Sequence, residues 1–541
     1  MKVIAVARRH LKLSLRFVIR PVPASIVAAL FNFAVCYFSS FVLLNVPLVL
    51  WGDQVGFYNA GSRVVLGQLP YRDYFQIVPP GTDLTYALLI KHFGLQLWIP
   101  NLLMACLVAM TALLMTLIAS HLMRGPVILL PGLLLAGIIL PASMDATHHW
   151  FSTIAVLAAV LVLLKETTLP RIAAAGALCG LAACFTQTKG ALAIAGFTVY
   201  LIYGARRHTI QPPKRWQEFL LLYGAAAAVF MVINAYFIRA AGIGQWLFHV
   251  LIYPLRYYSY PSVNNWRVLI HDFPEHNGIW KWVTFPFLYA TVPLVSIMFV
   301  VTIWRRWEVN RDKHWRKLLL VAIAGIAMFM AIAAAPSIKR LGTVSPPTLI
   351  LLAWLLHRPG KTATRLKLLL ACVAIALAVA IPVRIQTKTY VFLDLPAGRG
   401  AFKDTALCEE YRWLLENTHP GQFFFGLPPL YFAFHMRNPA AIEGFISSEY
   451  TRPQQIFALV EALESHPVPL LILRRSHDFL FTKDSPSDHL EPIRVYVTRN
   501  YQLTKTFPTG DEVWRRIGAP VPVVNNKDAD APAKAQDHTS Q

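Results

Sequence analysis

The chain has 541 residues, of which 56% are hydrophobic and only 14% are charged. A soluble protein carries roughly 25% charged residues, so this composition excludes an ordinary soluble domain and indicates a protein built into a membrane. The formal net charge is +22 at pH 7, but most Lys and Arg stand in short segments between apolar runs, a pattern of membrane topology and not of nucleic-acid binding.

The chain begins with a basic segment over residues 1–20, followed by an apolar run over 24–50. This run is longer than the roughly 7–15 residues of a signal-peptide core, so we expect an uncleaved first membrane helix. The apolar runs together predict about eleven membrane-spanning helices. They lie at roughly 24–50, 95–120, 126–141, 150–164, 171–187, 190–204, 218–240, 282–304, 318–335, 346–357 and 366–385.

The loops between these runs predict the orientation. With the N-terminus in the cytoplasm, loops 206–215, 305–317 and 357–367 fall inside, and all three are rich in Lys and Arg, as the positive-inside rule requires. The outer loops hold acidic residues: Asp53, Asp73, Asp83, Asp145, Asp272 and Glu275. We therefore predict a multi-pass plasma (inner) membrane protein whose C-terminal part is extracytoplasmic.

The outer segment 51–94 carries the most specific pattern. Asp53 stands at the membrane boundary, and the apolar residues after it recur at helical spacing, which predicts a short helix with one apolar face lying on the bilayer surface. They are Phe57, Ala60, Gly61, Val64 and Val65. A polar turn, PYRDYFQ, follows with Tyr71, Arg72, Asp73 and Gln76. After the break at Pro79-Pro80-Gly81, a second short helix is predicted to end at Gly94.

With its acid after the first span, a PYRD turn, PPGT and a helix ending in FG, segment 51–94 resembles the GT-C class of membrane glycosyltransferases. Within that class it is similar to the bacterial branch of protein O-mannosyltransferases, aminoarabinose transferases and Rgt-type galacturonic acid transferases. The resemblance continues more loosely through the hydrophobic half. It implies transfer of a sugar from a polyprenyl-phosphate donor to a hydroxyl of a lipid, glycan or protein at the outer membrane face.

The resemblance also implies that Asp53 is the general base that takes the proton of the acceptor hydroxyl. Two positions depart from the family pattern. Gln54 stands where many relatives carry a second acid, which speaks against a metal-binding acidic pair there, and Val78 stands where some relatives carry Lys. A Lys that binds phosphate must then come from another part of the chain.

Cations at the outer ends of the spans are the candidates for binding the donor phosphate. Lys189 lies between two apolar segments, where a TK pair recurs in similar proteins; the alternative is a hairpin tip with a snorkelling Lys. Arg340 lies beside Lys339 in a short outer loop, and contact with lipid headgroups is the alternative. Arg72 is the third candidate, although a local ion pair with Asp73 would explain it as well.

Other side chains could support the site: Asp73, Gln76, Asp145, His148 and Arg256. The Asp145-x-x-His148 pair could hold a divalent cation or belong to an ordinary interfacial loop. The sequence has no wider set of spaced ligands, so we assign no metal ligands and no certain cofactor, and a divalent cation stays an open alternative. Arg256 lies in the aromatic-rich outer loop 242–281, which fits either sugar stacking or an interfacial belt.

From Thr389 the composition becomes that of a soluble domain. We predict a helix over 407–416, a second around 456–463, a strand over 468–473 and a hairpin over 501–517. The fold class is therefore a mainly α-helical polytopic membrane protein with a small C-terminal α/β extracytoplasmic domain. The predicted domains are 1–388 (transmembrane) and 389–517 (extracytoplasmic), with a disordered tail over 518–541.

A transporter or flippase for a lipid-linked sugar, with no catalysis, is the alternative function. It would need ionisable residues buried along a path through the spans. The charges here cluster instead at the outer ends of the spans, which favours the enzyme. The six cysteines show neither a disulfide framework nor metal-ligand spacing.

Overall fold

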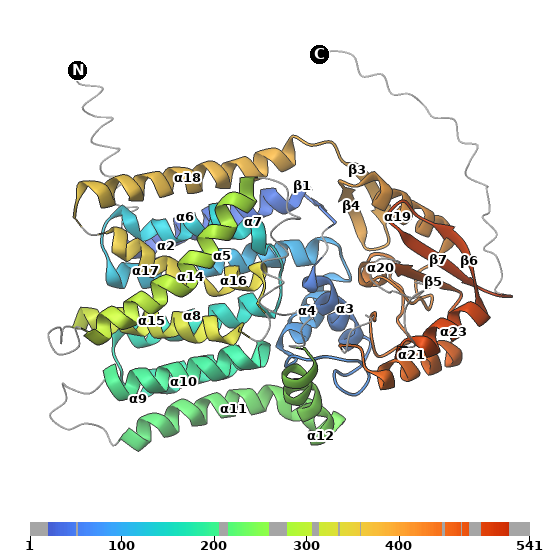
Figure 1. Cartoon of the computed structure of the whole chain (residues 1–541), viewed down its shortest axis with the longest axis horizontal. Coiled ribbons are helices and arrows are strands. Elements are labelled where there is room, and N and C mark those ends of the chain that lie inside the picture. The colour runs from blue at the N-terminus through green and yellow to red at the C-terminus, as the bar shows by residue number, and fades with distance from the viewer. Residues whose placement is uncertain are drawn as a thin grey trace, which may run out of the picture.

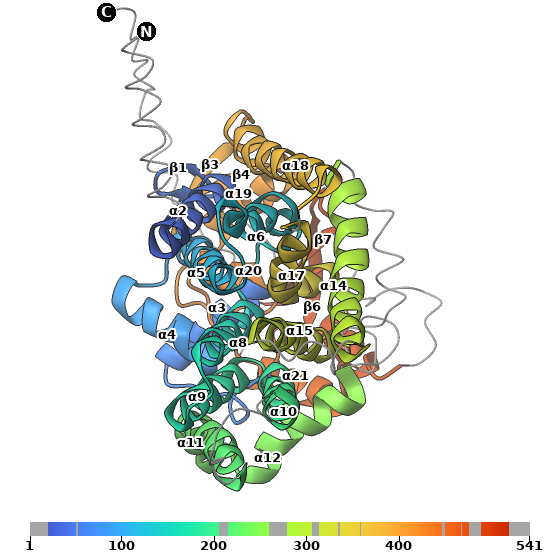
Figure 2. The same ribbon diagram turned by 90° about the vertical axis from the view of Figure 1, so that its left-hand side faces the viewer.

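A computed structural model describes residues 20–49, 52–204, 215–258, 279–305, 313–333, 336–357, 359–445, 450–466, 468–474 and 488–518. The predicted basic N-terminus, most of the inner loops at 206–215 and 305–317, the acids Asp272 and Glu275, and the tail from 519 lie outside these residues. Long helices run side by side in a bundle, and the C-terminal domain caps one end of it (Figures 1 and 2).

Each predicted span coincides with a helical segment. These are α2 (Pro21–Ser40), α5 (Trp98–Leu122), η1 (Pro126–Leu129), α6 (Leu130–Leu134), η2 (Leu135–Ile139), α7 (Leu140–Ser143), α8 (His148–Lys165), α9 (Leu169–Phe185), α10 (Gln187–Gly204), α11 (Arg215–Ala241), α14 (Ile279–Arg305), α15 (Lys313–Ala331), α17 (Pro346–Leu356) and α18 (Lys361–Gln386). Among the described residues, seven segments are long and apolar enough to cross a membrane, and three shorter apolar helices accompany them.

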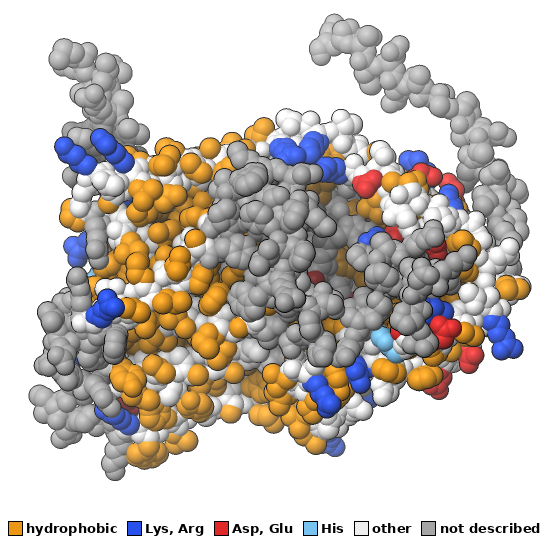
Figure 3. All heavy atoms as spheres, viewed as in Figure 1, with side chains coloured by type: hydrophobic (Ala, Val, Ile, Leu, Met, Phe, Trp, Pro, Cys, Tyr) orange, Lys and Arg blue, Asp and Glu red, His pale blue; other side chains and the backbone are white. Residues whose placement is uncertain are grey.

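The surface agrees with a membrane location. Figure 3 shows hydrophobic side chains over the bundle half, whereas Asp and Glu gather on the C-terminal domain. In α18, only 17% of the most apolar stretch is buried inside the protein, so its hydrophobic side chains need lipid around them. The chain is an integral membrane protein.

The first span is shorter than predicted. Helix α2 ends at Ser40, and residues that the prediction placed in the helix form a small hairpin of β1 (Phe41–Leu43) and β2 (Val46–Pro47). Val46 and Leu48 are buried in a cluster with Tyr390 and Ala401 from the start of the C-terminal part. An apolar run by itself does not distinguish a helix from a buried strand, which is why the boundary was missed.

Glycines allow neighbouring helices to approach closely. Gly176 and Gly180 of α9 lie one turn apart and face α11, where an added Cβ would lie 2.2 Å from the Leu222 carbonyl oxygen and 2.3 Å from that of Ala226. These distances are too short for a real Cβ, so both positions require glycine. This small-residue packing holds α9 against α11 in the membrane.

The segment between the first two spans forms two short helices, α3 (Asp53–Val65) and α4 (Gly81–Phe93), as predicted, and α4 ends at Gly94 with φ +76°. The predicted location of α3 on the bilayer surface is wrong. Ala60 and Gly61 are buried, and a Cβ on Gly61 would lie 2.6 Å from the Cβ of Tyr86 in α4. The apolar face of α3 therefore packs against protein, and α3 lies between the bundle and the C-terminal domain (Figure 1).

The C-terminal part alternates helices and strands. The hairpin β3 (Val391–Leu395) and β4 (Gly398–Phe402) precedes α19 (Thr405–Asn417), α20 (Pro428–Ala433), α21 (Pro453–Ser465), β5 (Leu470–Arg474), α23 (Glu491–Asn500), β6 (Tyr501–Thr506) and β7 (Asp511–Arg516). Strands β5, β7 and β6 form an antiparallel sheet in that order. The predicted helices, strand and closing hairpin are all present. Residues of β3, β4, α19 and α20 and one face of the β5–β7–β6 sheet join the hydrophobic core of the bundle, whereas α21, α23 and the other face of the sheet form a second core.

Candidate active site

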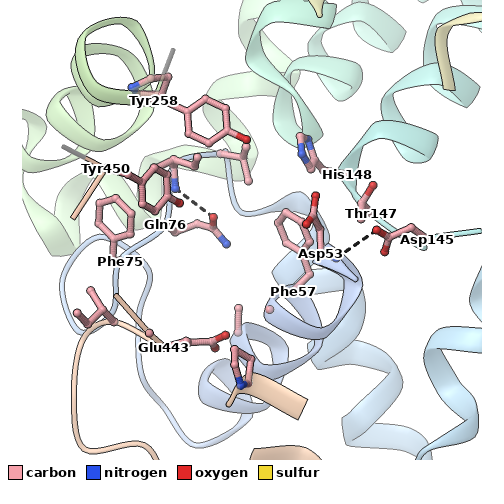
Figure 4. Close-up of a pocket in the computed structure, with 18 of the residues that line it drawn as sticks. Asp53, Phe57, Phe75, Gln76, Asp145, Thr147, His148, Tyr258, Glu443 and Tyr450 are labelled. Atoms are coloured by element: carbon pink, nitrogen blue, oxygen red, sulfur yellow. Dashed lines mark hydrogen bonds between the residues drawn. The ribbon is translucent and has the colours of Figure 1, made fainter. Parts of the chain in front are cut away.

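A cavity of about 910 Å³ lies where the bundle meets the C-terminal domain. Its walls come from the start of α3, α8 and α10, from η4 (Pro254–Tyr258) and α16 (Ile338–Val344), and from C-terminal loops around Leu427 and Glu443. Figure 4 shows Asp53 and His148 on one side of this cavity, with Tyr258, Tyr450 and Glu443 across from them. The size suits a ligand as large as a sugar with its phosphate.

Asp53 is the first residue of α3, and its side chain is exposed to the cavity. Its position is set by its backbone. The Asp53 N–H donates to Asp145 Oδ2 at 3.1 Å, and the Gln54 N–H donates to Asp145 Oδ1 at 2.8 Å (Figure 4). A buried carboxylate therefore binds the N-terminus of α3, where a negative charge is favourable, and leaves the Asp53 carboxylate facing the cavity.

Gln54 and Gly52 complete this anchor. The side chain of Gln54 is buried, and its Oε1 accepts a hydrogen bond from the Ala146 N–H at 2.9 Å. A Cβ on Gly52 would lie 2.9 Å from Asp145 Oδ2, so a glycine is needed for the close approach of this carboxylate. Gln54 thus ties α3 to the loop that carries Asp145, in place of the second acid expected from the resemblance.

Asp145 itself is held from several sides. Lys339 Nζ lies 3.3 Å from its Oδ2. Burial raises the pKa of Asp145 and Lys339 lowers it, with Asp53 adding to the increase. Asp145 therefore lines the cavity while its carboxylate binds α3 and Lys339, which makes it a positioning group for Asp53.

Arg340, a candidate for binding the donor phosphate, also lines the cavity. It lies in the first turn of α16, where the Ser337 hydroxyl caps the helix by accepting from the Arg340 N–H at 3.2 Å. Its guanidinium lies over the Tyr258 ring, 5.5 Å from the centroid, and donates to the Tyr258 hydroxyl. This contact holds a cation at the cavity wall, near Asp53.

Lys189 lies deeper than predicted. It is fully buried in α10 and is not among the residues that line the cavity. Its Nζ donates to the His149 carbonyl oxygen at 2.9 Å, to Thr153 Oγ1 at 3.0 Å and to Thr343 Oγ1 at 3.3 Å. Lys189 therefore ties α8, α10 and α16 together behind the cavity.

The helices that Lys189 joins present their N-terminal ends to the cavity. His148 and His149 begin α8, and Gln187 and Thr188 begin α10; all four line the cavity. The two imidazole rings lie 3.9 Å apart, and His148 Nδ1 is 2.8 Å from Thr186 Oγ1. Neither ring nitrogen of the buried His149 has a hydrogen-bond partner among the described residues. These helix ends leave polar groups available to an anionic ligand.

The other predicted residues divide into two groups. Gln76 lines the cavity, and its amide donates to the buried Asp83 at 3.0 Å. Arg72, Asp73 and Arg256 are not among the lining residues. Arg72 forms a bidentate pair with Asp73 at 2.8 and 2.7 Å, the local interaction that the sequence left open, and the exposed Arg256 lies over the Tyr257 ring.

The C-terminal domain contributes Glu443, which sequence reasoning missed. The Glu443 carboxyl lines the cavity and is 3.4 Å from Asn59 Nδ2 of α3 (Figure 4). Burial raises its pKa to about 7, while nearby Arg63 and the Asn59 hydrogen bond oppose the increase. The signal in the sequence was weak, a lone acid in the otherwise uncharged run NPAAIEGF.

The described residues contain no group of three or more His, Cys, Asp or Glu side chains arranged to hold a metal ion. In the Asp145-x-x-His148 pair, the Asp145 oxygens already bind α3 and Lys339, and His148 Nδ1 already contacts Thr186. The arrangement thus offers a carboxylate, a guanidinium and helix N-termini around one cavity.

No protein-family model and no curated protein matches this sequence. The crystal structure of ArnT from Cupriavidus metallidurans bound to undecaprenyl phosphate is similar, with a TM-score of 0.60 and 11% sequence identity over 91% of this chain and 98% of that chain. The cryo-EM structure of the arabinofuranosyltransferase AftD from Mycobacteria gives a TM-score of 0.45 and 12% identity over 91% of this chain and 40% of that chain. The likeness to ArnT shows that the chain has a GT-C-type fold, as the resemblance predicted.

Proposed function

We propose that the protein is a membrane glycosyltransferase that transfers a sugar from a polyprenyl-phosphate donor to an acceptor hydroxyl. One observation carries the proposal: the Asp53 carboxylate and the Arg340 guanidinium line the same cavity at the end of the membrane bundle. A base and an anion-binding group in one cavity are what transfer to a hydroxyl with a phosphate leaving group requires. The GT-C-type fold of ArnT, whose crystal structure contains undecaprenyl phosphate, supports the choice of donor.

The donor phosphate would bind between Arg340 and the N-terminal ends of α8 and α10. Arg340 supplies a planar set of N–H donors for phosphate oxygens, and the two helix ends add partial positive charge. Lys189 lies behind these helix ends, in contact with the His149 carbonyl oxygen. We therefore assign the first contact with the phosphate to Arg340, and a supporting role to Lys189.

In the proposed reaction, the acceptor oxygen attacks the anomeric carbon of the donor sugar while Asp53 takes the hydroxyl proton. A new carbon–oxygen bond forms, and the bond between the sugar and the phosphate oxygen breaks. The polyprenyl phosphate leaves with the electron pair of that bond, so its negative charge grows and its contact with Arg340 strengthens in the transition state. Asp145 and Gln54 hold α3 so that the Asp53 carboxylate stays in place for the proton.

The acceptor would enter from the side of the C-terminal domain. That wall carries Glu443, Phe425 and Tyr450, which combine a carboxyl with aromatic rings. Such a surface suits the hydroxyls and flat faces of a sugar, on a lipid, glycan or protein.

The test uses the purified full-length chain in lipid with a panel of radiolabelled polyprenyl-phosphate sugars. Release of polyprenyl phosphate is compared between wild type and Asp53→Asn, with Asp73→Asn as the matched control, because Asp73 is an outer acid outside the cavity. We expect Asp53→Asn to lose about 10²–10⁴-fold in rate, as for removal of a general base, and Asp73→Asn to keep its activity. A chelator arm tests whether a divalent cation takes part. Movement of the donor between leaflets without release would instead identify a flippase.

A further inference from the structure

A cluster of three cations lies at the end of α18, where the bundle meets the C-terminal domain. Arg384 is in the last turn of that helix, Lys388 follows it, and Lys403 comes from the loop after β4. Lys388 and Lys403 are close enough for their side chains to interact, and partial burial, Lys403 and Arg384 together lower the pKa of Lys388. Figure 3 shows Lys and Arg side chains gathered at this end of α18.

In the part of the chain that the structure describes, none of Arg384, Lys388 and Lys403 has a carboxylate within ion-pair distance. The acids nearest in sequence are engaged elsewhere: Asp404 caps α19 by accepting from the Ala406 N–H at 2.9 Å, and Asp394 lies 3.8 Å from Arg399. The C-terminal dipole of α18 favours Arg384 but not Lys403, which belongs to another element. Among the described residues, the cluster is therefore three positive charges with no carboxylate partner.

The cluster continues an apolar surface that faces lipid. On α18, exposed side chains recur at helical spacing up to the residue before Arg384. They are Leu368, Leu369, Ile375, Val379 and Val383. On the opposite side of α18, Ala374, Leu377 and Ala378 are buried against the bundle. Arg384 lies about 100° around the helix from Val383, on the side of the exposed Ala376 and Ala380, so the apolar surface of α18 adjoins the three cations.

Hydrogen bonds hold the end of α18 beside the cluster in place. Gln386 Nε2 donates to the carbonyl oxygens of Phe38 and Phe41 at 3.0 and 2.7 Å, which fixes the end of α18 to the β1–β2 hairpin. At the tip of that hairpin, Leu43 is 53% exposed and Leu44 is 79% exposed. Two adjacent exposed leucines beside a membrane span suit contact with lipid.

We propose that Arg384, Lys388 and Lys403 bind the phosphate-bearing headgroup of an anionic phospholipid in the leaflet next to the C-terminal domain, with its acyl chains along the exposed apolar side of α18. Charge complementarity argues for the headgroup, and the apolar surface that adjoins the cluster argues for a lipid and not a free anion. The site is separate from the cavity that holds Asp53, and it does not depend on the proposed reaction. It would anchor the C-terminal domain at the membrane surface.

The test measures lipid retention by the full-length chain in nanodiscs of phosphatidylcholine and phosphatidylglycerol, with native mass spectrometry counting the bound lipids. The variant is Arg384→Gln/Lys388→Gln/Lys403→Gln. The matched control, Arg399→Gln/Arg412→Gln/Lys505→Gln, removes the same charge from the C-terminal domain away from the cluster. We expect wild type and control to retain phosphatidylglycerol over phosphatidylcholine, and the variant to lose this preference by about tenfold or more, since each cation near a surface attracts anionic lipid.

Three results would overturn the proposal: equal phosphatidylglycerol retention by wild type and variant, an equal loss in the control, or displacement of the lipid by millimolar inorganic phosphate, which would identify a free-anion site. If the triple variant does not fold, Lys403→Gln alone, in an exposed loop, replaces it. Wild-type retention should also fall as salt rises, because screening weakens exposed charge pairs.

Discussion

Replacing Asp145 by Asn tests whether the anchor of α3 controls catalysis. The Asp145 carboxylate accepts two N–H bonds from the first turn of α3, at 3.1 and 2.8 Å. Asn offers a single acceptor oxygen and places an NH₂ group against the second N–H. A hydrogen bond to a charged group contributes about 1.5–3 kcal/mol, so we expect the anchor to lose about 2 kcal/mol. The Lys339 pair adds little, because the Lys339 side chain is 48% exposed.

The expected consequence is a misplaced Asp53. A shift of about 1 Å in a reacting group can cost about 100-fold in rate, and 2 kcal/mol corresponds to roughly 30-fold. We expect kcat for polyprenyl phosphate release to fall by about 30- to 100-fold in Asp145→Asn, with the KM for the donor nearly unchanged. The double variant Asp53→Asn/Asp145→Asn should be no slower than Asp53→Asn alone, since Asp145 acts through Asp53.

Asp73→Asn is again the matched control, because Asp73 also accepts a backbone N–H, from Leu69 at 2.8 Å, but outside the cavity. The reasoning is refuted if Asp145→Asn keeps activity within about twofold of wild type. It is also refuted if the two substitutions reduce the rate multiplicatively, which would give Asp145 a role of its own.

Three further predictions follow from contacts at or near the site. Arg340→Gln should raise the donor KM by about 10- to 100-fold through loss of a charged contact to phosphate, and it should also lower kcat, because that contact strengthens in the transition state; unchanged KM and kcat would remove Arg340 from the phosphate site. Gly52→Ala should reduce kcat as Asp145→Asn does, because the new Cβ would lie 2.9 Å from Asp145 Oδ2 and displace it, whereas wild-type kinetics would mean that the loop adapts. Glu410 is fully buried, and its pKa is raised first by burial and then by the nearby Asp511 carboxylate. The folded protein therefore keeps a proton on Glu410 that the unfolded chain releases above about pH 4.5, so the stability of the fold decreases as pH rises. Thermal unfolding at pH 5 and pH 8 should show a smaller difference for Glu410→Gln than for wild type; equal differences would contradict this.

Much of the fold could be predicted because the signals are local. Apolar run length reports a membrane span, helical spacing reports α3 and α21, and Pro79-Pro80-Gly81 and Gly94 mark the two ends of α4. The early end of α2 could not be read in this way. A buried hairpin and a buried helix are equally apolar, and contact with residues 390–401 decided between them.

The sequence by itself determined the membrane class, the positions of the spans and the presence of Asp53 at a membrane boundary, since run length, spacing and residue type are properties of neighbouring positions. Only the tertiary structure decided what surrounds Asp53. The carboxylate that anchors its helix belongs to Asp145, 92 positions away in the chain. The Lys189 ammonium is buried in the bundle and does not line the cavity, whereas Glu443 lines it from the C-terminal domain. A buried polar group takes whichever partner the packing brings within about 3 Å, and that choice depends on the whole fold.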